Sequence, residues 1–533
     1  MQNSTSQSNI QPYLLLLTWI GLLLLSGCWH QSLMAHDEGN YALEARFMVE
    51  SGDWLARLFW GNPVYTHGIA LNWLIAVGYT LFGISDGVAR LPSLIACLLS
   101  TFFLFEISRI LLKDSLAMLA SLILGVIFIW LEYARLATQD MLLVCLELTG
   151  LWALLQAERL PKGRIIWGFL AGSVIGLGFL VKSFMILLPV VALMPYLVLE
   201  HHRHRHLLNP GLYGGLIAGV LVDAIWLKLS LDRYGSLVTH QLFGKISELG
   251  AKPFHTDTGW HYYFWNIPIN AFPWAFFALI GLWVALKDYR KSPHVWLLIG
   301  YPLLLFLLLN LFPTKTPYYI LQLHPFTAMF AAIGLVFLSQ RLTSRLAQTI
   351  TYGFGILGIV LAIAGLVLLV KPPGIDWPRE ANQFGIVALI LGAGWSLLPV
   401  IPRHVSLAIS PQLWIGQLLI SSWLALGAVG LLGLVGDYSP ALKSVLQEPQ
   451  IASVLKANPV DFLVQDLDPE SHKTWILLSF YTPHLGKLKQ QIVELQPSTY
   501  AWLSPKINLD GKILYRVIGN VQQWTLVQVE KIP

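Results

Sequence analysis

Long apolar runs recur along most of this chain and are separated by short polar segments. A helix of about 20 apolar residues is long enough to cross a hydrocarbon core of about 30 Å. The pattern predicts about thirteen such helices before the composition changes near residue 437. The predicted spans are residues 12–28, 88–110, 115–133, 141–158, 165–181, 183–199, 211–229, 267–286, 294–312, 318–338, 348–370, 384–400 and 408–434.

Residues 68–83 form a shorter apolar segment, and the charge pattern decides how it is interpreted. If the N-terminus is cytoplasmic and this segment does not span, all the basic clusters fall on the cytoplasmic side, as membrane proteins prefer. If it spans, every cluster moves outside. We therefore predict an interfacial helix here, a cytoplasmic N-terminus and an extracytoplasmic C-terminus. The clusters are Arg109 with Lys113, Arg159 with Lys162 and Arg164, residues 201–206, Lys287 with Arg290 and Lys291, Arg341 with Arg345, and Arg403.

The last hundred residues have a different pattern, in which charged and amide side chains alternate with short apolar stretches. Strands are predicted at residues 461–465, 473–478 and 524–529, and helices at residues 439–456 and 483–495. The expected architecture is an all-α polytopic membrane domain, residues 1–436, followed by a small soluble α/β domain, residues 437–533. The membrane domain has two long outer loops, residues 29–87 and 230–266.

Composition supports the membrane interpretation. Of the 533 residues, 56% are hydrophobic and 12% are charged, about half the charged fraction of a typical soluble protein. The net charge of +5 reflects the loop clusters and gives no indication of nucleic-acid binding. Cys28, Cys97 and Cys145 lie in or beside apolar runs, without a spacing typical of disulfides or zinc sites. No glycine-rich phosphate loop occurs, so no nucleotide is expected.

Acidic residues gather at the outer ends of two predicted helices. Asp37 and Glu38 lie between the first span and an amphipathic segment, residues 41–54. Asp140 opens the span 141–158. Because the helix dipole favours a carboxylate at a helix N-terminus, capping is an alternative explanation for each acid. Their convergence on one face of the membrane favours a shared site.

Two lysines are predicted at the same face. Lys182 lies in a tight hairpin between two apolar runs, and Lys315 precedes the span 318–338. Ionisable groups near a membrane are costly unless they are paired, and a phosphate would be a suitable partner. Snorkelling of each lysine to the surface is the alternative.

Histidines in the outer loop 230–266 raise the question of a metal. His240, His255 and His261 could bind a divalent cation, but their spacing resembles no dedicated site, and no metal ligand or cofactor is assigned. The run of residues 201–206 is rich in His and Arg, and we interpret it as a cytoplasmic topology anchor.

These segments, in this order, resemble the GT-C class of polyprenyl-phosphate-sugar glycosyltransferases, in the branch of the lipid A aminoarabinose transferases and the relatives of protein O-mannosyltransferases. Residues 36–54 resemble the family's Asp-Glu loop and juxtamembrane helix. Residues 179–189 resemble its Thr-Lys-Gly hairpin, and residues 314–321 resemble its Lys-Leu-Pro-Thr-Tyr-Ile-Leu stretch. The resemblance covers about residues 10–340 and implies about thirteen spans with an outer C-terminal domain.

The resemblance also implies roles for individual residues. Asp37 and Glu38 would be catalytic, Asp140, Tyr41, His240 and His67 would position the acceptor or the sugar, and Lys182, Lys315 and Tyr319 would bind the donor phosphate. The chain departs from the family in three places. Residues 65–68 replace Glu-Lys-Pro-Pro or His-Pro-Pro, which leaves His67 as a basic group whose charge would vary with pH. Ser183 replaces a glycine, and Thr239 replaces a glutamate.

The expected activity is transfer of a sugar from a polyprenyl-phosphate carrier to a lipid, protein or glycan acceptor at the outer face, with inversion at the anomeric carbon. Asp37 would act as the general base, and the lysines would stabilise the departing phosphate. One alternative is a transporter or flippase of lipid-linked sugars, for which charges near the midplane and repeated halves would be expected. Another is a non-enzymatic envelope scaffold that binds the donor without turnover.

Overall fold

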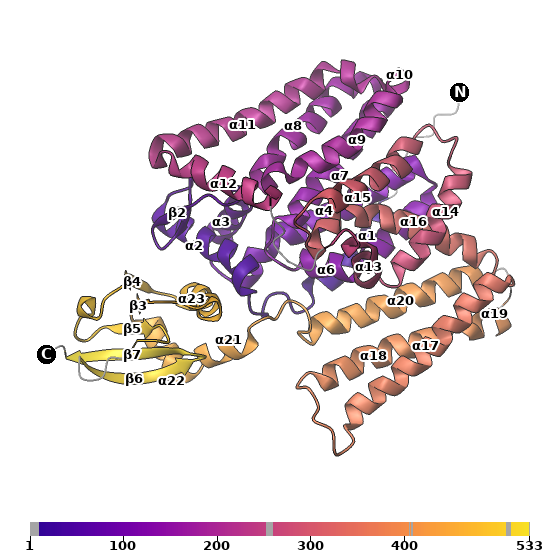
Figure 1. Ribbon diagram of the computed structural model, residues 1–533. Helices are drawn as coiled ribbons and strands as arrows, with labels where there is room; N and C mark the ends of the chain where they lie inside the picture. Colours follow the sequence, from indigo (N-terminus) through magenta and orange to yellow (C-terminus); the bar gives the residue numbers. More distant parts are fainter. Residues whose placement is uncertain (1–9, 252–258, 405, 407–408, 508–512, 532–533) are drawn as a thin grey trace.

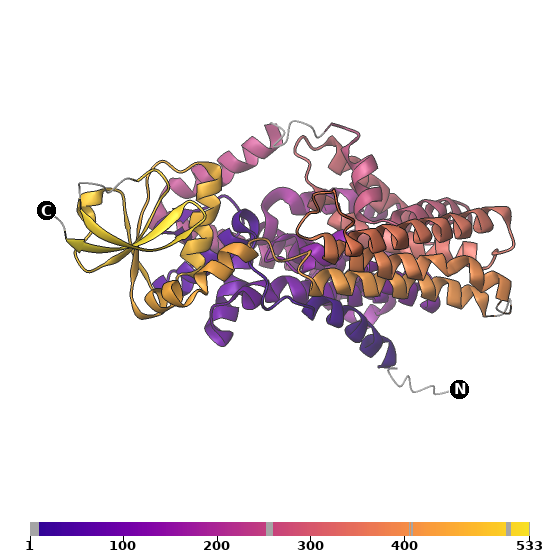
Figure 2. The same cartoon turned by 90° about the horizontal axis from the view of Figure 1, so that it is seen from below.

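The computed structural model describes residues 10–251, 259–404, 406, 409–507 and 513–531. It has an elongated body of helices with a small β-sheet at one end (Figures 1 and 2). The helices of the body are α1 (Gln11–Leu25), α4 (Asp86–Leu111), α5 (Asp114–Leu124), α6 (Phe128–Ala134), α7 (Asp140–Arg159), α8 (Arg164–Lys182), α9 (Leu187–Leu199), α11 (Pro210–Tyr234), α13 (Tyr262–Asn270), α14 (Trp274–Asp288), α15 (Tyr301–Leu311), α16 (His324–Ser339), α17 (Arg345–Val370), α18 (Ala381–Ser396) and α20 (Ser410–Leu431).

Many of these helices are long and apolar enough to cross a membrane. Among the described residues, eight helical stretches meet that description, or up to ten if each of two bent pairs, α5 with α6 and α13 with α14, counts as one span. The longest stretch, Pro161–Leu199, is a hairpin. Arg164, at the start of α8, donates to the carbonyl oxygen of His204 beyond the end of α9 over 2.8 Å. Counting the hairpin as two crossings and adding the shorter helices Gln11–Leu25 and Trp296–Leu311 gives the thirteen expected segments.

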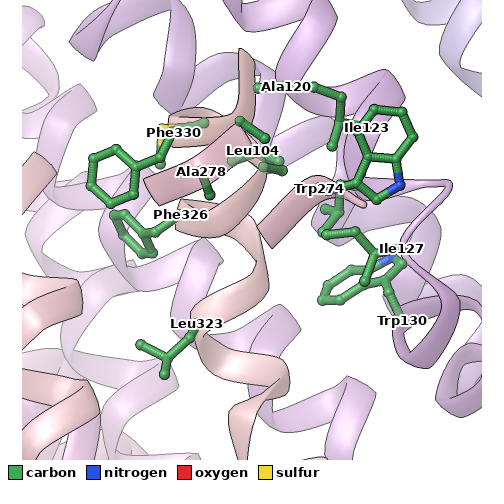
Figure 3. Packing of buried hydrophobic residues seen from close by; sticks show 14 of the residues in the cluster. Leu104, Ala120, Ile123, Ile127, Trp130, Trp274, Ala278, Leu323, Phe326 and Phe330 are labelled. Atoms are coloured by element: carbon green, nitrogen blue, oxygen red, sulfur yellow. The ribbon is translucent and has the colours of Figure 1, made fainter. Parts of the chain in front are cut away.

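The helices pack closely where small residues face each other. A Cβ added at Gly172 of α8 would lie 2.0 Å from the carbonyl oxygen of Leu212 in α11, so this contact requires glycine. Larger side chains fill the centre of the body, where α4, α5, α14 and α16 meet (Figure 3). There Trp274 is fully buried, and its indole donates to the carbonyl oxygen of Val126 over 2.9 Å. This close packing fixes the positions of the helices, and therefore also of the polar residues at their ends.

The first outer loop folds into several short elements. It consists of a π-helical turn η1 (Ala35–Gly39), the amphipathic helix α2 (Asn40–Ser51), the hairpin β1 (Arg57–Phe59) with β2 (Asn62–Val64), and α3 (Ala70–Phe82). Helix α3 has only 13 residues and would reach about 20 Å, too little for a hydrocarbon core. It buries Leu71 and Ile75 and exposes Leu74 and Leu81, as an interfacial helix would.

The C-terminal region contains a five-stranded mixed sheet in the order β4-β3-β5-β7-β6. Strand β3 is parallel to β4 and β5, and β7 is antiparallel to β5 and β6. The fold class expected from the sequence is confirmed. The elements are α21 (Pro440–Leu446), α22 (Pro449–Ala457), β3 (Val460–Leu463), α23 (Pro469–Tyr481), β4 (Leu485–Lys489), β5 (Tyr500–Leu503), β6 (Leu514–Val521) and β7 (Trp524–Lys531).

Two elements predicted in this region were wrong. Residues 473–478 belong to α23 rather than to a strand. Residues 483–495 form β4 followed by only a three-residue 3₁₀ turn, η8 (Ile492–Glu494), rather than one helix. Asp468 caps α23 by accepting a hydrogen bond from the backbone N–H of Ser471, which starts a helix that the short apolar run alone does not reveal. Residues 485–489 form a strand because they pair with β3, a partner distant in sequence.

Candidate active site

A cavity of about 760 Å³ lies where the first outer loop, several helix ends and the C-terminal region meet. It combines acids, bases and aromatic rings from segments that are far apart in the sequence. Its charged and histidine side chains are His36, Asp37, Glu44, Arg57, His67, Asp140, Lys182, Lys245 and His472, and its tyrosines are Tyr41, Tyr133, Tyr318 and Tyr319. The structure therefore brings together six of the expected residues, Asp37, Tyr41, His67, Asp140, Lys182 and Tyr319.

The π-helical turn η1 separates the two adjacent acids. The backbone N–H of Gly39 donates to the carbonyl oxygen of Met34 over 2.6 Å, which closes a wide turn of the kind often found at functional sites. The Asp37 side chain is accessible from the cavity, whereas Glu38 is fully buried and does not line it. Neighbouring carboxylates thus lie in different environments.

Glu38 forms a buried ion pair with Arg90. The Arg90 guanidinium donates to the two Glu38 oxygens over 2.6 and 2.9 Å, and to the carbonyl oxygens of Cys28 and Gly436 over 2.9 Å each. Removing one partner of a buried pair leaves an uncompensated charge, so this contact is important for stability. It links the end of α1, the turn that carries Asp37 and the segment that leads to the C-terminal region.

Asp37 has the electrostatics of a general base. Burial against the protein raises the pKa of its carboxyl group, and the charge of Asp140 raises it further, while His36 and Lys182 oppose the increase. A carboxylate with a raised pKa holds a proton more strongly than an exposed one and is a better base once ionised. Asp37 is therefore suited to accept a proton within the cavity.

Asp140 and Lys182 form an ion pair at the wall of the cavity. Asp140 is the first residue of α7 and Lys182 is the last residue of α8, so two antiparallel helices bring them together. The Lys182 ammonium also lies 4.8 Å from the ring centre of Tyr318 and 5.0 Å from that of Tyr319, within cation–π distance. After Lys182 the backbone of Ser183 takes φ +49° and ψ −133°, a conformation that glycine adopts most easily.

A second group of polar residues lines the cavity beside α2. Arg57 donates to Glu44 over 3.2 Å and to the hydroxyl of Thr66 over 2.9 Å. The Thr66 hydroxyl lies 3.0 Å from Nδ1 of His67. Burial, together with the charges of Arg57 and the two cavity lysines, lowers the pKa of His67 to about 3. His67 is therefore neutral at physiological pH, which corrects the expectation that its charge would vary there.

The structure does not bring Lys315 and His240 into the cavity lining. Lys315 is buried in the loop before α16 and donates to the carbonyl oxygen of Phe312 over 2.9 Å. Its neighbours Thr314 and Thr316 line the cavity instead. His240 is exposed on helix α12 (Leu237–Ala251), the helix that contributes Lys245.

Within the described ranges no group of three or more His, Cys, Asp or Glu side chains is arranged to hold a metal ion. His255 lies outside the described residues. No metal ligand is assigned.

Arg57 and His472 were missed by the sequence interpretation. Arg57 could have been found by the criterion that singled out Lys182, since it is a basic residue in a segment expected outside. His472 gives no such signal, because it comes from the C-terminal region and reaches the cavity only through the tertiary fold.

Comparison with known proteins identifies the family and the fold. Residues 66–227 match the family described as dolichyl-phosphate-mannose-protein mannosyltransferase. An undecaprenyl phosphate-alpha-4-amino-4-deoxy-L-arabinose arabinosyl transferase of Pseudomonas aeruginosa is 30% identical over 407 residues, covering 72% of this chain and 70% of the relative. The corresponding transferase of Aeromonas hydrophila is 26% identical over 396 residues, covering 69% of this chain and 68% of the relative. The crystal structure of ArnT from Cupriavidus metallidurans bound to undecaprenyl phosphate has a TM-score of 0.75 at 20% identity, covering 98% of both chains.

The family match and the relatives show that the chain is an integral membrane glycosyltransferase that takes its sugar from a polyprenyl-phosphate carrier, and not a transporter. It is a multi-pass protein of the inner membrane. The chain belongs to the family of undecaprenyl phosphate-alpha-4-amino-4-deoxy-L-arabinose arabinosyl transferases.

Proposed function

We propose that this enzyme transfers an amino sugar such as 4-amino-4-deoxy-L-arabinose from undecaprenyl phosphate to a hydroxyl or other oxygen nucleophile, with inversion at the anomeric carbon. The names of its relatives suggest this donor. The observation that carries the proposal is that Asp37 lines the same cavity as the Asp140–Lys182 ion pair. A base and a cation on one cavity are what an inverting displacement at a sugar phosphate requires.

The reaction proceeds by displacement in our proposal. Asp37 accepts the proton of the acceptor as its oxygen forms a bond to the anomeric carbon. The bond from that carbon to the phosphate oxygen breaks, and undecaprenyl phosphate leaves with the electron pair. Lys182 neutralises the charge that grows on the phosphate, helped by Lys245 and Arg57 on the cavity wall.

Other expected residues receive supporting roles. Asp140 holds Lys182 and the amino or hydroxyl groups of the sugar, while Tyr41, Tyr319 and neutral His67 contact the bound substrates. Glu38 holds the Asp37 turn through Arg90, and Lys315 holds the loop of Thr314 and Thr316. His240 is assigned no contact with the reacting groups.

We also propose that the cavity faces the extracytoplasmic side, with the N-terminus in the cytoplasm and residues 437–533 outside. Asp140 and Lys182 lie at one end of the α7–α8 pair, and Arg159 and Arg164 lie at the other. The positive-inside tendency supports a cytoplasmic location for the arginine end. A cysteine introduced at Lys287 should be protected from an impermeant thiol reagent in intact cells, and labelling there would contradict the orientation.

The activity is tested with the purified full-length protein. It is mixed with undecaprenyl phosphate-4-amino-4-deoxy-L-arabinose and with total envelope lipids from a strain that lacks the gene. Mass spectrometry should show acceptor lipids heavier by one aminopentose and an equal amount of free undecaprenyl phosphate. If this donor is inert and undecaprenyl-phosphate hexoses release the carrier, the sugar is wrong. If no carrier is released from any of them, the proposed function is wrong.

A further inference from the structure

The C-terminal region contributes a side chain to the wall of the catalytic cavity. His472, in the first turn of α23, lies edge to face with His36, at 5.6 Å between ring centres. Phe59 of β1 stacks against the same ring at 6.2 Å. Since His36 directly precedes Asp37, this pair of imidazoles stands beside the proposed base.

Helix α23 is held firmly in this place. The buried Arg46 of α2 donates to the carbonyl oxygens of Phe480 and Thr482 over 3.0 and 2.8 Å, which satisfies acceptors that a helix end leaves free. The Tyr481 hydroxyl donates to Asp86 of α4 over 2.5 Å. The C-terminal end of α23 is thus fixed to the outer loop and to the membrane domain, and its N-terminal end reaches the cavity.

The two histidines have unused hydrogen-bonding capacity. Among the described residues, none forms a hydrogen bond with a ring nitrogen of His36 or His472. Burial lowers the pKa of His472, and His36 lowers it further, so its neutral ring offers one donor and one acceptor. Polar groups that line a cavity and lack protein partners are available to a ligand.

The position of the pair indicates which substrate it would meet. Lys182, Tyr318 and Tyr319 form the proposed phosphate side of the cavity. His36 and His472 come from the outer loop and the C-terminal region instead, next to Asp37. An acceptor must place its nucleophilic oxygen beside the base, so these imidazoles lie on the acceptor side.

We propose that His472, together with His36, binds an oxygen-bearing head group of the acceptor and directs its nucleophile toward Asp37. The C-terminal region is then part of the active site and determines acceptor specificity. This inference rests on the proposed function. His472 is a positioning residue, and the bond-forming step remains that of Asp37.

Steady-state kinetics with the full-length enzyme test this assignment. The probes are undecaprenyl phosphate-4-amino-4-deoxy-L-arabinose as donor and the envelope lipid extract as acceptor. His472→Ala should raise the apparent KM for the extract roughly tenfold, the usual effect of losing one or two hydrogen bonds, and leave the donor KM within about twofold. His472→Gln should restore part of the affinity, because an amide also donates and accepts. His484→Ala, at an exposed histidine of the same region, is the matched control.

A double variant separates positioning from general loosening of the fold. If the imidazoles hold one group together, His36→Ala with His472→Ala should cost less than the sum of the two single effects. A wild-type acceptor KM in His472→Ala would overturn the inference, as would an equal loss of donor and acceptor affinity. Failure of the wild-type enzyme to release undecaprenyl phosphate would instead overturn the proposed function and this inference with it.

Discussion

Helix α7 carries a largely buried acid at each end, and the two ends differ in what surrounds the acid. Asp140 and Glu158 have nearly the same side-chain exposure, 9% and 10%, and both pair with a cation, Lys182 and Arg203 respectively. Asp140 lines a cavity of about 760 Å³. Glu158 is enclosed by protein donors, since one oxygen accepts from Tyr196 and lies 3.3 Å from His206, and the other lies 3.4 Å from His294.

The difference shows that a buried ion pair does not by itself identify a catalytic site. The Glu158 network satisfies its acid with fixed neighbours and ties the end of α7 to the α9–α11 connection. The Asp140 pair is similar in charge, but it leaves room for substrates and lies within electrostatic reach of Asp37. Space beside the charges, and a second carboxylate that lines the same cavity, make the chemical difference.

The largest effect should come from removing the base. Asp37→Asn keeps the size of the side chain but cannot accept the proton, so kcat should fall roughly 10²- to 10⁴-fold. At the other end of α7, Glu158→Gln should keep kcat within a few-fold and reduce stability by about 1–3 kcal/mol, because it removes an acceptor of several donors. Carrier release and thermal unfolding of the two purified variants measure this. Full activity in Asp37→Asn would contradict the proposed mechanism.

Removing each cation is the next test of the comparison. Lys182→Ala should reduce kcat roughly 10²-fold and weaken donor binding, because the phosphate loses the charge that stabilises its departure. Arg203→Ala breaks the pair at the other end of α7 and should affect mainly the unfolding temperature. Turnover at saturating donor and the donor KM, measured for both variants, distinguish a loss of catalysis from a loss of stability. Equal losses of activity in both variants would mean that the two ends of α7 do not differ in function.

The sequence predicted that Asp140 and Lys182 meet at one face better than it predicted the network at Glu158. Asp140 and Lys182 are conspicuous because they stand at the ends of apolar runs on the face expected to lack basic residues. The helical spans and the helix after Asp37 could be predicted because apolar length and periodicity are local properties. The spans and this helix are each encoded within a single segment of the chain.

Features that depend on distant contacts could not be predicted in this way. Asp37 and Glu38 are adjacent, and only the turn geometry and Arg90 decide that Glu38 is turned away from the cavity. Lys315 resembles a phosphate ligand in sequence, yet its ammonium is used by the carbonyl oxygen of Phe312. His472 reaches the cavity through a domain contact that Arg46 and Asp86 hold in place.

The pH dependence should sharpen the comparison further. Asp37 must be ionised to act as a base, and its raised pKa means that activity is lost as pH falls through a value above that of an ordinary aspartate. Asp140 raises this pKa, so Asp140→Asn should move the acidic limb of the kcat profile to lower pH. Glu158→Gln should leave the limb in place. If the acidic limb of the kcat profile moves to higher pH in Asp140→Asn, or does not move, the coupling between the two acids is contradicted.

The smallest expected effect concerns the backbone beside each pair. Ser183 follows Lys182 with φ +49° and ψ −133°, a region that side chains disfavour. Arg205 follows the short helix α10 (His201–His204) with φ +53° and ψ +35°, an ordinary left-handed conformation. Ser183→Gly should therefore raise stability by about 1 kcal/mol, because the strain it relieves exceeds the extra entropy of an unfolded glycine. Arg205→Gly has less strain to relieve and should be neutral or slightly destabilising. Thermal unfolding of the two variants in the same detergent measures the difference. The absence of a gain in Ser183→Gly would show that the backbone of the Lys182 hairpin carries no strain.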